Sequence, residues 1–268
     1  MFVPIRLPYE PWLTFDLQGE FDQKGGKRTK WGTKEEYLAC IQECKKHGVV
    51  VYAGEFDRPH HLASALTLSL SDAVLNHKAG ADFAEKFHAI EVDNEDRNKE
   101  VSGLYEIEGW TGFNFPGRKG EDGKLKYSEQ EYHHYHFTGV DFDNKTGKNA
   151  IFKIQGENKD WADDVDGEKG SFDYLMFADL DHSHPDVAKD TINWGEWIVK
   201  EADLAGFRFD AIKHYSSVSC CAAFSRLCSN LTSFWRCRAS STTSCARFAS
   251  AATTRTCSAL ESSGRMRS

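Results

Sequence analysis

The sequence predicts an α/β fold that a long β-rich segment interrupts, and three observations support this. A helical pattern followed by a buried strand occupies residues 33–52. About a hundred polar, glycine-rich and aromatic-rich residues with little helical period come later in the chain. A second helical pattern and a second strand then occupy residues 184–214.

The first helix–strand pair has clear end signals. Residues 33–48, TKEEYLACIQECKKHG, have Thr33 where a helix cap is expected and Gly48 where a helix stops. The β-branched run at 49–52 follows directly, which is typical of a parallel strand buried on both faces. One helix, a short turn and a buried strand predict one repeat of an α/β fold.

The interrupting segment has the alternation of short antiparallel strands. After a strand-like run at 72–80, alternation recurs in YHHYHF at 132–137, in GVDFDNKTGKNAIF at 139–152 and in GSFDYLMFADLD at 170–181. Irregular sequence of this length inside a compact domain indicates a separate functional lobe.

The second helix–strand pair carries the first candidate chemistry. The helical pattern at 184–206 has Gly206 as its expected stop, and the strand FRFDAIKH follows. Arg208 and Asp210 are two apart on that strand, so their side chains point to the same face. A guanidinium beside a carboxylate keeps it ionised, which suits either an ordinary buried ion pair or a carboxylate nucleophile.

Charge and hydropathy exclude some partners. The formal net charge of -8 is uneven, with 26 Lys and Arg against 40 Asp and Glu in residues 1–215, and seven Arg against one Glu in residues 216–268. An acidic main body argues against a nucleic-acid partner. No apolar run is long enough to span a membrane, and the first residues lack the pattern of a signal peptide, so the chain as written predicts a cytoplasmic protein.

The last segment, 216–268, differs in composition from the rest. It is rich in Ser, Cys, Arg and Ala, without periodicity, and it holds six of the eight cysteines without CxxC spacing. We expect neither a metal site nor a disulfide framework there. Such a composition indicates an out-of-frame or disordered tail.

Four stretches, in order, resemble the α-amylase family, glycoside hydrolase family 13, and its liquefying branch in particular. They are GEFDQKGGKRTKWGT at 19–33, DAVLNHKAGAD at 72–82, FDYLMFADLDHSHP at 172–185 and GFRFDAIKH at 206–214. The resemblance implies a partial (β/α)8 TIM barrel with a β-rich lobe, domain B, inserted after the third strand.

In that fold the chain divides into four segments. The segments are 1–80, the N-terminal part of the barrel; 81–178, the inserted lobe; 179–215, barrel helix 3 and strand 4; and 216–268, the tail. Residues 54–71 interrupt a motif that runs straight on in the family. Because these 18 residues correspond to 54 nucleotides with a possible splice donor and acceptor, we interpret them as a retained intron.

The resemblance also implies an activity, retaining endo-hydrolysis of α-1,4-glucosidic bonds in starch or glycogen, and a set of site residues. Asp210 would be the nucleophile and Arg208 its ion partner. The implied substrate-binding residues are Asp72, His77, Lys213 and His214. The implied Ca²⁺ ligands are Asn76, Asp173, Asp179 and the backbone carbonyl of His214, and calcium prefers such oxygen ligands.

Some positions depart from the family pattern. Thr138, Ala162 and Ser183 stand where acidic ligands are frequent in that branch, which argues against a second cation site. The acid/base Glu of the family follows the nucleophile, but after Tyr215 this sequence has one acidic residue, Glu261, in an unrelated context. We therefore expect the chain as written to be inactive on its α-glucan substrate.

Two other functions remain open. A zinc-dependent hydrolase is suggested by histidines near acidic residues. The residues concerned are His133, His134, His136, Asp179, Asp181, His182 and His184. A non-catalytic glucan-binding remnant is the other alternative, for which lobe aromatics would be either sugar-stacking platforms or lobe core: Trp110, Phe113, Phe115 and Tyr135.

Overall fold

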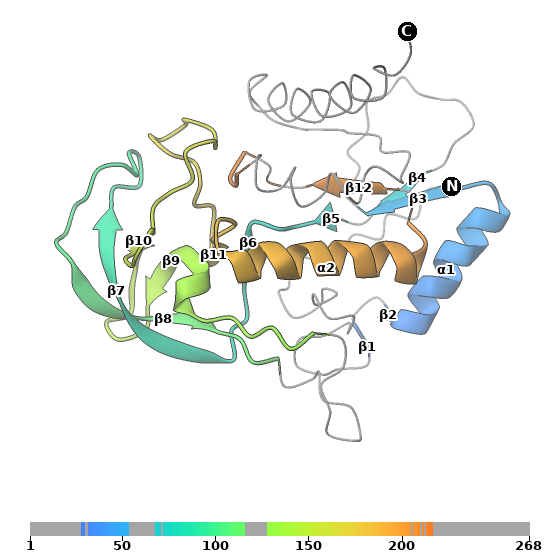
Figure 1. The fold of residues 1–268 in the computed structure, drawn as a ribbon, viewed down its shortest axis with the longest axis horizontal. Coiled ribbons are helices and arrows are strands. Elements are labelled where there is room, and N and C mark those ends of the chain that lie inside the picture. The colour runs from blue at the N-terminus through green and yellow to red at the C-terminus, as the bar shows by residue number, and fades with distance from the viewer. Residues whose placement is uncertain are drawn as a thin grey trace, which may run out of the picture.

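A computed structural model describes residues 28–29, 32–53, 68–70, 72–115, 128–204, 206–209, 211 and 213–216. Within these ranges an antiparallel sheet lies at one end of the molecule, and parallel strands with helix α1 lie at the other (Figure 1). Helix α2 runs between the two parts. An α/β part and a β-rich part are thus both present within the described ranges, while the barrel and the inserted domain stay predictions.

Both predicted helices are present, and one of them ends differently from the prediction. Helix α1, Lys34–Lys46, begins at Thr33, whose hydroxyl accepts the Glu36 N–H while the Glu36 carboxylate accepts the Thr33 N–H. Helix α2, Pro185–Ala202, has His184 as its N-cap. The predicted stop at Gly206 is wrong, because Asp203 ends the helix in a left-handed conformation with φ 49°.

The parallel sheet contains four short strands in the order β4-β3-β12-β5. The strands are β3, Val50–Ala53; β4, Leu68–Leu70; β5, Asp72–Ala73; and β12, Gly206–Phe209. A closed barrel is not visible in the described ranges. A further two-stranded sheet, β1 (Arg28–Thr29) with β2 (Gly32–Thr33), precedes α1.

The register of β12 runs continuously across the interrupted motif. Gly206 and Phe207 pair with Tyr52 and Ala53, and the next two residues of β12 pair with Asp72 and Ala73. Residues 53 and 72 therefore occupy successive positions against β12, although 18 residues separate them in sequence. The pairing register along β12 therefore passes from residue 53 to residue 72 as it would if residues 54–71 were absent.

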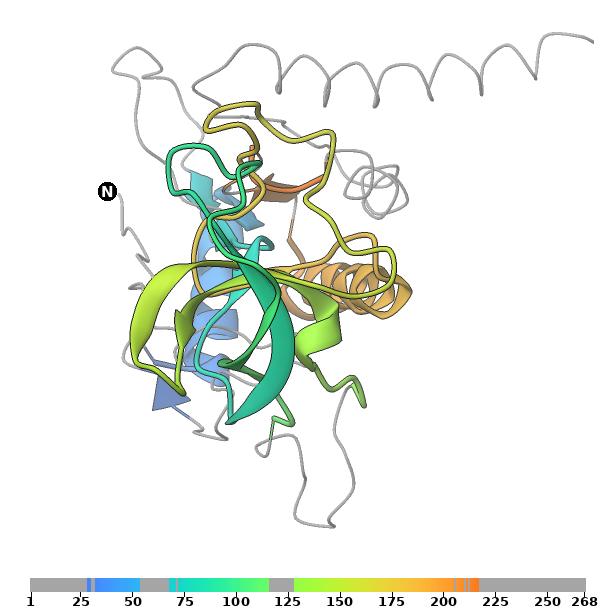
Figure 2. The ribbon, with the colours of Figure 1, turned by 90° about the vertical axis from the view of Figure 1, so that its left-hand side faces the viewer.

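The antiparallel sheet has six strands in the order β6-β11-β9-β10-β7-β8. The strands are β6, His77–Lys78; β7, Phe83–Val92; β8, Tyr105–Gly112; β9, Phe137–Asp143; β10, Lys148–Ile154; and β11, Ala178–Leu180. Its long strands are strongly curved (Figure 2). The predicted strand at 72–80 is thus divided, with β5 in the parallel sheet and β6 in the antiparallel one.

Two predicted strands are largely wrong. In 132–137 the 3-10 helix η2, His134–His136, replaces the strand, because the His136 N–H bonds to the His133 carbonyl and the His136 ring accepts the His133 N–H. In 170–181 only β11 at the end is extended into a ladder.

Two main clusters of buried side chains support these elements. One lies among α1, β3 and α2 and includes Ile41, Val51, Trp194 and Ile198. The other fills the antiparallel lobe with aromatic side chains and includes Val187 from the first turn of α2. Helix α2 therefore contributes to both clusters.

The continuous register predicts that residues 54–71 can be removed. We expect the chain with these residues deleted to unfold at a higher urea concentration, since closing an 18-residue loop costs on the order of 2 kcal/mol and the short edge strand β4, which the deletion also removes, has only three cross-strand pairs with β3. Deletion of 54–70, which leaves Ser71 between Ala53 and Asp72, is the matched control. It shifts the register by one residue and should lower the midpoint. An unchanged or lower midpoint for the first deletion would contradict the prediction.

Candidate functional site

The motif strands β5 and β12 lie next to each other at the centre of the candidate site. Asp72 of β5 is the cross-strand partner of Arg208 of β12. Because the two strands are parallel, the residues that follow them gather at the same edge of the sheet. Only the backbone of these two residues is described, and Asp210 lies outside the described residues.

Asp179 is the most deeply engaged carboxyl at this edge. It is 1% exposed, and its two oxygens accept hydrogen bonds from the Asn76 side-chain amide and the Thr138 hydroxyl, each at 2.6 Å. Burial, followed by repulsion from Asp173, raises the pKa of the Asp179 carboxyl well above its ordinary value. The ionised form of Asp179 is therefore costly here unless positive charge lies nearby.

Asp173 is a second buried carboxyl in this region. It is 4% exposed, and its Oδ2 has no hydrogen-bond partner in the described part of the chain. Burial raises the pKa of Asp173 to about 7, an effect that the Ala162 backbone N–H opposes and that Asp181 increases. The Oδ1 of Asn76 is also buried without a partner. Unpaired oxygens of this kind are the ligands that calcium prefers.

His214 and Lys213 are held against the lobe. The His214 ring lies at 2.6 Å from the Phe172 carbonyl through Nδ1, and burial lowers its pKa to about 4, so a neutral ring donates this bond. Lys213 lies over the Phe172 ring and pairs with Glu168 at 3.1 Å. Phe172 directly precedes Asp173 in the sequence. The contacts of His214 and Lys213 with Phe172 therefore hold both residues near the buried carboxyls.

His77 faces the lobe as well. Its ring centroid is 5.7 Å from that of Phe177, and its Nδ1 is buried without a hydrogen-bond partner in the described ranges. Burial lowers the pKa of His77 to about 4. The structure thus brings the predicted Asn76, Asp173 and Asp179 together and places His77 and His214 beside them, while the roles assigned to these residues stay predictions.

Sequence reasoning missed two cations near this cluster. The buried Arg97 guanidinium donates to the Tyr174 carbonyl and lowers the pKa of both Asp173 and Asp179. The Lys159 ammonium pairs with Asp181. Neither residue lies in a recognisable motif. The many acidic residues in the sequence indicate that cationic side chains lie near some of them. The sequence pattern does not identify which Lys or Arg these are.

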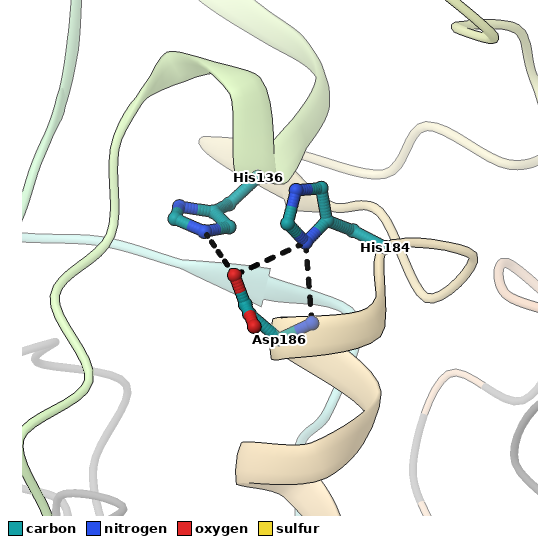
Figure 3. A group of neighbouring side chains, drawn as sticks. All are labelled: His136, His184 and Asp186. Carbon is teal, nitrogen blue, oxygen red and sulfur yellow. Dashed lines mark hydrogen bonds and ion pairs between the residues drawn. The ribbon is translucent and has the colours of Figure 1, made fainter.

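The histidines of the zinc alternative form a different group from the one expected. His136, His184 and Asp186 have donor atoms within 4.8 Å of one another (Figure 3), and the Asp186 Oδ2 is 3.9 Å from His136 Nε2 and from His184 Nδ1. By contrast, His182 bonds to the Leu75 carbonyl through Nε2 at 2.8 Å. His184 therefore faces His136 rather than Asp179.

The hydrogen bonds of this group argue against zinc. A histidine that binds a metal through one nitrogen normally donates a hydrogen bond from the other. Here His136 Nδ1 accepts the His133 N–H, so the neutral ring carries its proton on the Nε2 that faces Asp186. His184 Nδ1 likewise accepts the Asp186 N–H at 3.3 Å. The geometry favours a hydrogen-bonded junction between η2 and α2.

The lobe aromatics divide into two pairs. Phe113 and Phe115 are 1% exposed and belong to the lobe core. Trp110 and Tyr135 are each 46% exposed, so their rings are accessible for stacking.

None of the helices in the described ranges is long and apolar enough to cross a membrane.

Comparison with known proteins identifies the family. No family model matches the chain. An α-amylase of Geobacillus stearothermophilus is 44% identical over 200 residues, which cover 75% of this chain and 32% of that protein. A glucan 1,4-alpha-maltohexaosidase of Bacillus sp. (strain 707) is 42% identical, covering 77% and 35%, and the cytoplasmic α-amylase of Escherichia coli (strain K12) is 35% identical, covering 77% and 37%. The chain spans about a third of the length of these curated relatives, and over that span it belongs to the α-amylase family, glycoside hydrolase family 13.

Proposed function

We propose that this chain carries one part of the catalytic centre of an α-amylase-type glycosidase that acts on α-1,4-linked glucans. The observation that supports this most directly is the pairing of Asp72 with Arg208, because it places two separate motifs side by side at one edge of a parallel sheet. The names of the relatives support the substrate class. We further infer the (β/α)8 barrel for the intact fold, and the Escherichia coli relative, named cytoplasmic, supports the same compartment here.

The proposed reaction is a double displacement. Asp210 attacks the anomeric carbon as the glycosidic C–O bond breaks, and Arg208 keeps its carboxylate ionised. A second carboxyl must protonate the leaving oxygen and then deprotonate the water that releases the sugar from Asp210. Glu261 is the one acidic residue after Tyr215, and nothing in its context fits that role. We therefore propose that the 268-residue chain alone does not hydrolyse starch.

The buried carboxyl cluster supports a structural calcium site. Asn76, Asp173 and Asp179 would hold the ion with the backbone carbonyl of His214. The unpaired oxygens of Asn76 and Asp173 fit an oxygen-preferring cation, and burial, the largest cause of the raised pKa values of Asp173 and Asp179, makes their ionised forms costly without a counter-ion. Bound calcium would neutralise these carboxylates. The residues themselves join the end of β5 to the lobe through the hydrogen bond between Asn76 and Asp179.

A glucan-binding remnant is the second candidate function. The exposure of Trp110 and Tyr135 favours it, because accessible aromatic rings are suited to stacking on sugar faces. Binding to insoluble starch without release of reducing sugar would support this reading for the chain as it stands.

The nucleophile assignment is tested in a chimera. Residues 19–53 joined to 72–215 should replace the matching part of the Geobacillus stearothermophilus relative, and release of reducing sugar from starch is measured with calcium present. We expect an active chimera that loses about 10⁴-fold in kcat on Asp210→Asn, because the covalent step is removed. The exposed Asp163→Asn is the matched control and should retain activity. Equal activity of the two variants would refute the role of Asp210.

The calcium site is tested by its pH dependence. Because the pKa of Asp173 is raised to about 7, the metal-free fold is stabilised by protonation below that pH and loses this stability as pH rises from about 4 to 7. Calcium competes with protons, so its increase in Tm should be several degrees at pH 7.5 and much smaller at pH 5. Asp173→Asn should abolish the increase and Asp163→Asn should not. A calcium effect that is equal at both pH values would count against the site.

A further inference from the structure

A buried ammonium group lies beside the carboxyl cluster. The Lys159 side chain is 7% exposed, and its Nζ donates to the Asp181 carboxylate at 2.6 Å and to the Phe137 carbonyl at 3.1 Å. The Asp181 side chain is 9% exposed, and its other oxygen accepts the N–H and the hydroxyl of Ser183. The Lys159 ammonium thus contacts two oxygens, and each oxygen of the Asp181 carboxylate accepts at least one hydrogen bond.

The pair is electrostatically part of the same cluster as the candidate calcium ligands. Asp181 follows Asp179 by two residues, and Thr138, whose hydroxyl donates to Asp179, directly follows Phe137, whose carbonyl accepts from Lys159. Asp173 is the third buried carboxyl of the cluster. Of these three carboxyls, Asp181 alone has a cationic side chain within ion-pair distance in the described ranges. The Arg97 guanidinium acts on the other two from a distance, since its contact is with the Tyr174 carbonyl.

Of the three carboxyls, Asp181 is paired with a cationic side chain in the described ranges, whereas Asp173 and Asp179 are not. A primary ammonium at 2.6 to 3.1 Å from two oxygens contacts them as a bound cation of similar size would. We propose that Lys159 is the resident cation of this cluster, so that the cluster binds a single divalent ion, at Asp173 and Asp179, and that loss of the ammonium creates a second cation site between Asp181 and the Phe137 carbonyl.

This inference rests on the proposed calcium site, and it differs from an ordinary structural ion pair in what it predicts. A structural pair changes stability when it is broken but leaves the number of bound ions unchanged. A resident cation sets that number. The decisive measurement is therefore the stoichiometry of tightly bound Ca²⁺, obtained by isothermal titration and by equilibrium dialysis with elemental analysis.

We expect one tightly bound Ca²⁺ in the wild-type chain and two in Lys159→Ala. Lys159→Arg, which keeps the charge, and Lys159→Ala with Asp181→Asn, which removes both charges, are the matched controls and should each bind one. If Lys159→Ala is unfolded without calcium, millimolar Ca²⁺ should refold it with two ions bound, as followed by circular dichroism.

The possible results separate the two proposals. No bound Ca²⁺ in the wild type would refute the calcium site itself. Two ions in the wild type, one ion in folded Lys159→Ala, or failure of Ca²⁺ to refold an unfolded Lys159→Ala chain would each refute the role of Lys159. Two ions in the double variant would show that the second site does not depend on the Asp181 charge, which also contradicts the inference.

Discussion

The carboxyl of Asp179, buried where the lobe meets the parallel strands, is the constraint on which the arrangement of the chain depends. It lies on β11 and bonds to Asn76, 103 positions earlier, which follows β5. Burying a charge without a counter-ion costs several kcal/mol. The hydrogen bonds from Asn76 and Thr138 offset part of that cost, and the positive charge of Arg97 offsets a further part. A fold that joins two sheets at such a point must offset the remaining cost with nearby positive charge or with a proton.

Much of the fold could be predicted from local sequence, and the failures have physical causes. The ends of α1 follow from Thr33 and Gly48 because capping depends on neighbouring residues alone. The 3-10 turn at 134–136 depends on the rotamer of the His136 ring, which no alternation of residue types encodes. The two long strands β7 and β8, FAEKFHAIEV and YEIEGWTG, were not predicted, because they contain several Glu and Lys residues, which are depleted in strands.

Only those site residues that lie in recognisable motifs could be predicted from the sequence. Asn76, Asp173 and Asp179 come from separate stretches that resemble the family, and the structure brings them into one buried cluster. Arg97 and Lys159 could not be predicted, because their partners are set by tertiary packing across long sequence separations. The side chains of Asp72 and Arg208, with all of Asp210, lie outside the described part. The proposed catalytic residues therefore stay a prediction, whereas the proposed calcium ligands Asn76, Asp173 and Asp179 have a described geometry whose role is also a prediction.

Helix α2 packs in both parts of the molecule and links their cores. Its first turn places Val187 in the lobe core, and two turns later Trp194 and Ile198 enter the cluster under the parallel strands. Melting of either end removes hydrogen bonds that the rest of the helix needs, since helix formation is cooperative. The packing of one helix in both clusters therefore couples the opening of the lobe to that of the parallel part more tightly than a flexible linker would.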